Sequence, residues 1–114
     1  MNVTVKRSQW LRGEADSYLL RRSDNRMCCL GFVCKEMGAK DEDIASIGCP
    51  SSVRNDDIIY NWPDRAFGQG RGMLMTVTSR MMQINDDRVK DDATREQQLV
   101  ALGHDIGINL TFVN

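Results

Sequence analysis

The stretch Met27-Cys28-Cys29-Leu30-Gly31-Phe32-Val33-Cys34 decides how this chain is expected to fold, because the hydrophobic period changes within it. The residues before it resemble a strand followed by a turn. From about Cys29 the apolar residues instead recur at i, i+3, i+4 and i+7, which is the spacing of an amphipathic helix. That stripe consists of Leu30, Val33, Cys34 and Met37. We therefore predict a helix that begins near Cys29 and ends at the glycine in position 38.

The same stretch holds three of the four cysteines of the chain, so a metal site, a redox centre, a nucleophile and a small-residue core are all to be considered. A structural zinc site usually takes thiolates from a Cys-x-x-Cys pair, and the chain has none. Separations of five and six residues rotate side chains on a helix by about 140° and 240°, so Cys28 and Cys29 do not share a face with Cys34. Free cysteine is commonly buried. We predict small core residues and no metal.

Thiol catalysis is the remaining chemical reading of this stretch. Cys28 or Cys29 at a helix N-terminus would have a suitable setting for a lowered pKa. His104 is the only histidine, and its neighbour Asp105 does not face it on a helix. No disulfide framework is expected either, since the chain carries no secretion signal and the cytosol keeps thiols reduced. We predict neither an enzyme nor a protein with a cofactor.

Both ends of the chain alternate polar and apolar residues, as half-buried strands do. These segments are 2–6 and 108–113. The fold class that we predict is α+β, with a small antiparallel sheet that includes both terminal strands and is packed with several short helices. Residues 1–114 are expected to form a single globular domain. Further strands are expected at 17–21, 27–29 and 73–77. Helices are expected at 8–11, 41–47 and 79–84, and from Asp91 or Asp92 to about 106. Ser8 and Ser79 are the candidate caps of the first and third of these helices.

Composition narrows the function classes. Hydrophobic residues make up 41% and charged residues 27%, which is typical of a globular protein. The net charge of −1 argues against direct nucleic-acid binding, which depends on neutralised phosphates. No apolar run approaches the roughly 18 residues of a membrane span, so a cytosolic protein is expected.

The segment 61–72 is expected to be a long, mobile loop that recognises a partner or ligand, because proline and glycine interrupt it repeatedly. Arginines and glycines there could form an anion-binding nest, and exposed aromatic residues beside arginine are favoured at protein interfaces. Both readings stay open. The candidate binding residues are Trp62, Arg65, Phe67, Gln69 and Arg71.

The order of motifs along the chain resembles a family of small proteins encoded by tailed bacteriophages and prophages. That family has an early tryptophan, a Cys-Cys-Leu-Gly-[Val/Phe]-x-Cys motif, and a segment ending in Asn-Asp before the last helix. Trp10, Cys28 to Cys34, and Met81 to Asp86 match these features in order. The segment from Pro50 to Gly72 matches poorly. The resemblance implies a phage origin and no catalytic residues.

The resulting hypothesis is a phage-encoded, non-enzymatic accessory protein that acts in the host cytoplasm. It would bind and inhibit a host protein of an antiviral defence system. The alternative is a small-ligand binder, a sponge that sequesters an anionic signalling nucleotide around Arg65, Gln69 and Arg71.

Overall fold

The computed structural model describes residues 1–14, 17–67 and 76–114. Two short 3-10 helices, six α-helices and two strands occur in these ranges. Their order is β1 (Asn2–Lys6), η1 (Arg7–Gln9), α1 (Cys29–Glu36), α2 (Asp41–Ile44), η2 (Pro50–Ser52), α3 (Asp56–Asn61), α4 (Asp64–Phe67), α5 (Val77–Asp86), α6 (Asp92–Asp105) and β2 (Asn109–Val113).

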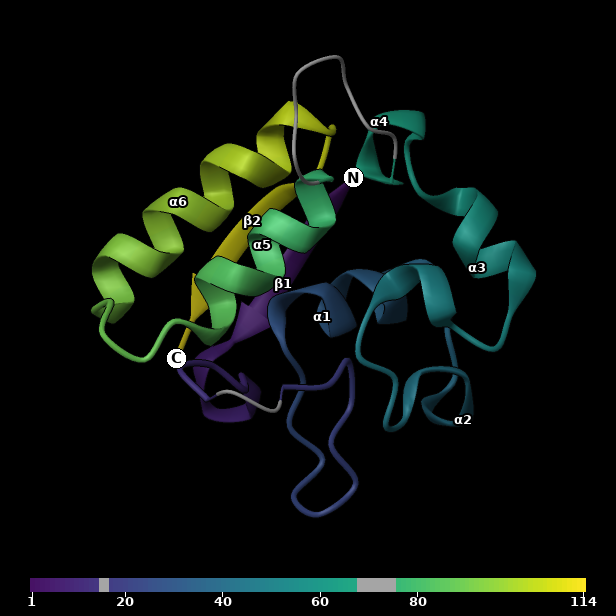
Figure 1. Cartoon of the computed structure of the whole chain (residues 1–114), viewed down its shortest axis with the longest axis horizontal. Coiled ribbons are helices and arrows are strands. Elements are labelled where there is room, and N and C mark those ends of the chain that lie inside the picture. Colours follow the sequence, from purple (N-terminus) through teal and green to yellow (C-terminus); the bar gives the residue numbers. More distant parts are fainter. Residues whose placement is uncertain (15–16, 68–75) are drawn as a thin grey trace.

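The sheet consists of the two terminal strands, and they are parallel (Figure 1). The predicted antiparallel arrangement is therefore wrong, although the two terminal segments do pair. Val3 lies opposite Leu110 and Val5 opposite Phe112. Alternating hydrophobicity indicates a strand with one buried face, and it contains no information about strand direction. Parallel strands need a long crossover, and here almost the whole chain lies between them.

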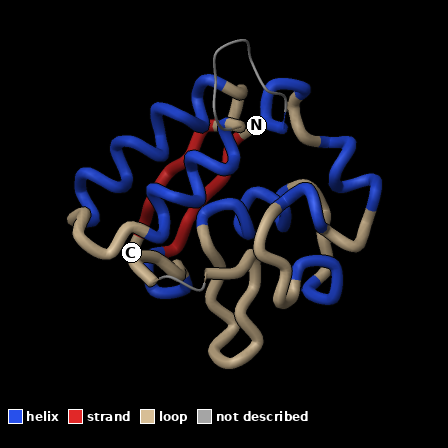
Figure 2. The backbone as a smooth tube through the Cα atoms, in the orientation of Figure 1, coloured by secondary structure: helices blue, strands red, loops and turns tan. Residues whose placement is uncertain are grey.

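Three helices build the core around this sheet. α1 contacts β1, α6 contacts β2, and α5 contacts both α1 and α6. Figure 2 shows the two strands beside α6 and α5, with α2, α3 and α4 on the other side of the molecule. Trp10, Leu30, Met81 and Leu99 are among the largest fully buried side chains. No helix in the described ranges is long and apolar enough to cross a membrane.

Several predicted elements differ from the structure. The strands expected at 17–21 and 27–29 are reduced to isolated bridges, such as Arg21 with Arg26 and Trp10 with Met27. In the region predicted as a strand at 73–77, residues 73–75 lie outside the described ranges, and Val77 is the first residue of α5. Local propensity favoured strands at 17–21 and 27–29, but their backbone hydrogen bonds go to several different partners, such as Leu19 N–H to the Ile47 carbonyl and Met27 N–H to the Gln9 carbonyl, and are assigned only as isolated bridges.

The helices that the sequence predicted from strong period and caps are confirmed. α1 begins at Cys29, and α6 begins after Asp91, whose side chain accepts a hydrogen bond from the Thr94 N–H at 2.7 Å. Ser79 was proposed as the cap of the helix at 79–84, but Thr76 fills that role by accepting from the Ser79 N–H. Ser8 lies within η1 and caps no helix, because η1 has no side-chain cap.

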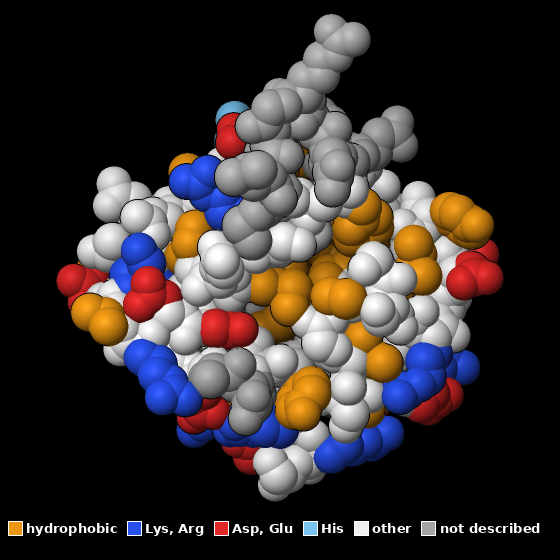
Figure 3. All heavy atoms as spheres, viewed as in Figure 1, with side chains coloured by type: hydrophobic (Ala, Val, Ile, Leu, Met, Phe, Trp, Pro, Cys, Tyr) orange, Lys and Arg blue, Asp and Glu red, His pale blue; other side chains and the backbone are white. Residues whose placement is uncertain are grey.

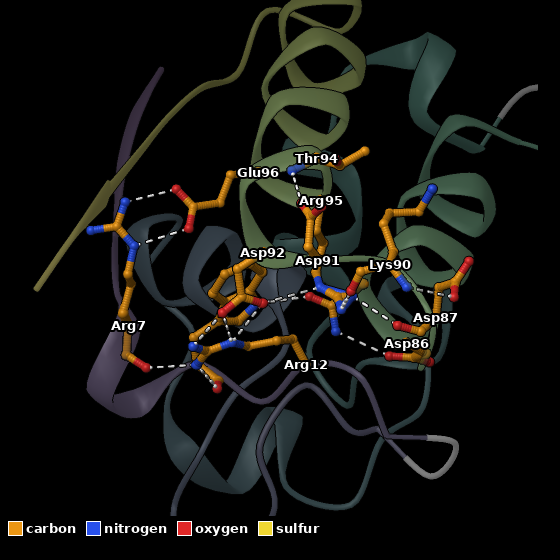
Figure 4. Close-up of polar contacts among 12 residues, drawn as sticks. Arg7, Arg12, Asp86, Asp87, Lys90, Asp91, Asp92, Thr94, Arg95 and Glu96 are labelled. Atoms are coloured by element: carbon orange, nitrogen blue, oxygen red, sulfur yellow. Dashed lines mark hydrogen bonds and ion pairs between the residues drawn. The ribbon is translucent and has the colours of Figure 1, made fainter.

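Arginine contacts join the N-terminal segment to α6 (Figure 4). Arg7 donates two hydrogen bonds to the Glu96 carboxylate, at 2.9 and 2.7 Å. Arg12 binds Asp92 at 2.9 Å. Bidentate pairs of this kind fix orientation as well as adding energy. These contacts hold the segment after β1 against the start of α6.

Candidate functional site

The cysteines of the central stretch lie in the core. Cys28, Cys29 and Cys34 are 1% exposed or less. Burial raises the pKa of Cys28 to about 12 and that of Cys34 to about 12, and it raises the pKa of Cys29 well above its ordinary value. These thiols therefore stay protonated at neutral pH, and a thiol in that state is a poor nucleophile. The prediction that they are core residues is confirmed. Among the described residues, no group of three or more histidine, cysteine or acidic side chains is placed to hold a metal ion.

Asn85 explains why the separate motifs of the sequence belong together. Its side-chain oxygen accepts hydrogen bonds from Trp10 Nε1 at 2.8 Å and from the Cys29 N–H at 3.2 Å. Its amide nitrogen donates to the Leu11 carbonyl at 2.9 Å. Cys28 is the N-cap residue of α1, but its side chain makes no capping hydrogen bond. Asn85, 56 positions from Cys29 in the sequence, instead accepts the hydrogen bond from the first N–H of this helix. The early tryptophan, the cysteine motif and the Asn-Asp segment thus form one buried polar centre.

The predicted binding loop has a different structure in its first half. α3 ends at Asn61 and α4 covers Asp64–Phe67, so these residues are not a long loop. Trp62 is only 4% exposed, and its ring lies 5.6 Å from that of Phe67, which is partly buried. Trp62 therefore belongs to the core, where no partner reaches it. The prediction of an exposed aromatic anchor failed at this residue because a tryptophan in a polar segment can still complete a core.

The polar residues of the predicted binding loop, Arg65, Gln69 and Arg71, stay a prediction. Gln69 and Arg71 lie outside the described residues, and Arg65 is described only through its backbone in α4. The structure therefore does not bring these three side chains together or hold them apart.

A groove of about 600 Å³ lies along the outer side of α5. Figure 3 shows hydrophobic side chains gathered near the centre of this face of the molecule, with acidic and basic side chains around them. Residues from α5, from the loop after it and from the segment before η2 line the groove. They are Cys49, Ser79, Met82, Gln83, Ile84, Asp86, Asp87 and Lys90.

The amphipathic pattern of α5 positions this lining. Thr78, Met81 and Asn85 form its buried side. Residues at i, i+3, i+4 and i+7 share one face of a helix, so the side that points outward presents a continuous stripe. That stripe is Ser79, Met82, Gln83 and Asp86. Asn85 anchors the helix inward, and the next residue, Asp86, is consequently held at the groove.

Asp86 is the unusual side chain of the groove. Its carboxylate is half-buried, and one oxygen accepts a hydrogen bond from the Asn85 amide at 3.0 Å. Desolvation by burial raises its pKa, and the hydrogen bond from Asn85, with smaller effects of Ser17 and of the charge of Arg95, only partly opposes this rise. No ion pair joins Asp86 to another residue of the described ranges. A carboxylate in this state favours a cation that can approach it through the groove.

Buried Arg95 contacts the segment between α5 and α6, as Figure 4 shows. Its guanidinium donates to the Asp87 carbonyl at 2.8 Å and to the Lys90 carbonyl at 2.6 Å. These bonds from α6 hold residues 87–90 in a compact turn. Arg95 therefore holds Asp87 and Lys90, two residues that line the groove, in place.

Cys49 also lines the groove. Burial by itself would raise the pKa of its thiol, but hydrogen bonds with the hydroxyls and backbone N–H groups of Ser51 and Ser52 lower the pKa below the ordinary value. Its sulfur lies 3.4 Å from Ser51 Oγ and 3.2 Å from Ser52 Oγ. Of the four cysteines, this partly exposed one is the thiol that lines the groove.

Comparisons with family models, with curated proteins and with solved structures find no match to this chain. The function must therefore be argued from the site. Sequence reasoning pointed instead to the segment 61–72, and none of the candidate binding residues predicted there lines this groove. It did not identify Asp86 and Cys49 as residues of one groove, since they are 37 positions apart and no local pattern links them.

Proposed function

We propose that this chain is a phage-encoded, non-enzymatic accessory protein that binds and inhibits a protein of a host antiviral defence system in the host cytoplasm. The observation that supports it best is the groove along α5, with an apolar centre and a half-buried carboxylate. The order of motifs that resembles a phage family supports the origin.

The composition of the groove favours a protein partner. Interfaces are enriched in methionine and aromatic side chains at their centre and have a polar rim. Met82 and Ile84 are partly exposed, while Ser79 and Gln83 offer hydrogen-bonding groups beside them. A protruding side chain of a partner would replace water on this surface and bury apolar area, at roughly 25 cal/mol per Å².

The positions of the thiols are consistent with binding as the activity. The three cysteines of the central motif take part in the core. Asn85, which resembles a polar site residue in sequence, is fully buried and saturated by backbone and tryptophan partners. The distinctive residues of the chain thus build the scaffold, and the surface of α5 is left to contact a partner.

The proposal is tested by expressing the chain in bacteria that each carry one antiviral defence system, and by measuring plaque formation of a phage that the system blocks. We expect plaque formation to be restored with at least one system. The variant Gln83→Arg should abolish the effect, because the introduced arginine fills the groove and can pair with Asp86, one turn away. Gln97→Arg, at an exposed position of α6, is the matched control and should behave as the unmodified chain.

Two results would contradict the proposal. One is the absence of restored plaque formation with every system tested, together with stabilisation of the purified chain by cyclic nucleotides in a thermal-shift assay; this would favour the sponge. The other is full activity of Gln83→Arg, which would place the binding surface elsewhere.

A further inference from the structure

Two neighbouring carboxylates at the groove are in different electrostatic situations. Asp87 accepts a hydrogen bond from the Val89 N–H at 2.9 Å, and this bond, with a smaller contribution from the charge of Lys90, lowers its pKa. Asp86 accepts a hydrogen bond from the neutral amide of Asn85, and the Ser17 hydroxyl and the charge of Arg95 add smaller effects that do not outweigh the effect of burial on its pKa. Neither carboxylate forms an ion pair within the described ranges, so the difference is that backbone N–H groups stabilise the charge of Asp87, whereas burial disfavours the charge of Asp86.

Holding Asp86 in this position costs stability. A carboxyl group whose pKa is raised on folding binds its proton more tightly in the folded state than in the unfolded state. The folded state therefore loses stability as the pH rises from the unfolded pKa through the folded one, and the loss persists at neutral pH. Proteins tolerate such local costs mainly at functional sites.

The surroundings of Asp86 fit one kind of group. Met82 lies one turn before it on the same stripe, and Ile84 adds a second apolar contact. Lysine and arginine carry an alkyl stem that packs on apolar surface and a charged end that seeks a carboxylate. A purely apolar side chain would leave Asp86 desolvated and unpaired, and an acidic one would be repelled.

We propose that the groove accepts one arginine or lysine side chain of the partner, with its stem against Met82 and its charged end on Asp86. This inference rests on the proposed function, because it specifies the partner of the same surface. The partner segment therefore carries a basic residue, and charge complementarity selects it from other protruding segments.

The test uses four peptides, Ac-Gly-Leu-Xaa-Leu-Gly-NH2, in which Xaa is arginine, lysine, citrulline or glutamate. Each is titrated into the labelled full chain and followed by two-dimensional amide NMR. The arginine and lysine peptides should shift the amide signals of Gln83, Asp86 and Lys90 in a saturable manner. Citrulline, which keeps the shape of arginine and lacks its charge, should bind about tenfold more weakly, and glutamate should not bind.

Asp86→Asn is the decisive variant, since it keeps the oxygen that accepts from Asn85 and removes the charge. This variant should lower the affinity for the arginine peptide about tenfold. The control Asp105→Asn, at an exposed position, should leave that affinity unchanged. Equal binding of the arginine and citrulline peptides, an unchanged affinity in Asp86→Asn, or no saturable shift in the groove would each overturn the inference.

The plaque assay separates this failure from that of the proposed function. If the unmodified chain and Asp86→Asn restore plaque formation equally well, the inference that Asp86 binds a basic side chain of the partner is wrong. The proposed inhibitory function then still stands. If the peptides bind as expected and no defence system is inhibited, the groove chemistry is right and the proposed target class is wrong.

Discussion

At the scale of single residues, Gly31 shows why the cysteine motif includes a glycine. It lies in the first turn of α1, where a side chain would normally favour the helix. A Cβ atom at this position would overlap the Leu19 carbonyl oxygen and lie 2.9 Å from Met27 Cβ. The backbone at Leu19 can approach α1 so closely only because residue 31 has no side chain.

Gly31→Ala is therefore expected to destabilise the protein by about 2 kcal/mol or more, despite a gain of up to about 1 kcal/mol in helix propensity. Chemical denaturation followed by circular dichroism measures the difference. Gly48→Ala is the control, because nothing lies within 4 Å of its would-be Cβ and its backbone needs no positive φ. Equal stability of the two variants would mean that the close approach of Leu19 is not required for the fold.

At the scale of elements, caps decide where the helices begin. α5 has Thr76 and α6 has Asp91 as side-chain caps, whereas α1 takes its cap from Asn85 in a distant element. A local cap can be recognised in sequence, because it lies a fixed number of residues before the helix. A cap from a distant element, such as Asn85 for α1, cannot be recognised in this way.

The Asp91 cap predicts a specific pH dependence. Hydrogen bonds from the backbone and then the side chain of Thr94 lower the pKa of Asp91 from its ordinary 3.8. Its contribution to stability is thus fully present above pH 3.8 and is lost as the pH falls through the lowered value. Asp91→Ala should be less stable than the unmodified chain at pH 7, and the gap should narrow at pH 2.

Asp91→Asn provides the matched comparison, since asparagine caps helices without a charge. Its stability difference from Asp91→Ala should hardly change between pH 7 and pH 2. Thermal unfolding at both pH values measures these differences. A gap between the unmodified chain and Asp91→Ala that is as large at pH 2 as at pH 7 would show that the charge does not matter.

At the scale of the whole molecule, the parallel pairing of β1 with β2 joins the two ends of the described chain. The N-terminal amine donates to the Gly107 carbonyl at 3.0 Å, and the Asn109 N–H donates to the Met1 carbonyl at 2.8 Å. Val3 and Val5 are buried beneath α1 and beside β2. Every other element lies between these strands in the sequence, so the pairing closes the fold.

Deleting residues 109–114 removes β2 and exposes the apolar side of β1. Burial of a single valine or leucine side chain contributes about 1.5–3 kcal/mol, and small domains are stable by only about 5–15 kcal/mol. We expect the shortened chain to lose its cooperative thermal transition in calorimetry. Deletion of Asn114 alone, which follows β2, should keep that transition. A cooperative transition in the shortened chain would show that the helices fold without the sheet.

Much of the local structure could be predicted from the sequence, because its causes are local. The period from Leu30 to Cys34 predicted α1, and Asp91 with Gly107 marked the ends of α6. Burial of the cysteines followed from their place on the apolar stripe. The binding loop was less predictable, since Trp62 packs into a core that only distant residues create.

The sequence by itself determined the helices α1 and α6, where these two begin, and that the central cysteines are structural. It did not predict α3 or α4. Spacing and side-chain chemistry act over a few residues, so they can be read along the chain. Only the tertiary structure decided that the terminal strands run parallel, that Asn85 caps α1, and that Asp86 and Cys49 line the same groove. These features depend on contacts between distant residues, and such contacts form only when the burial of the whole core makes them favourable.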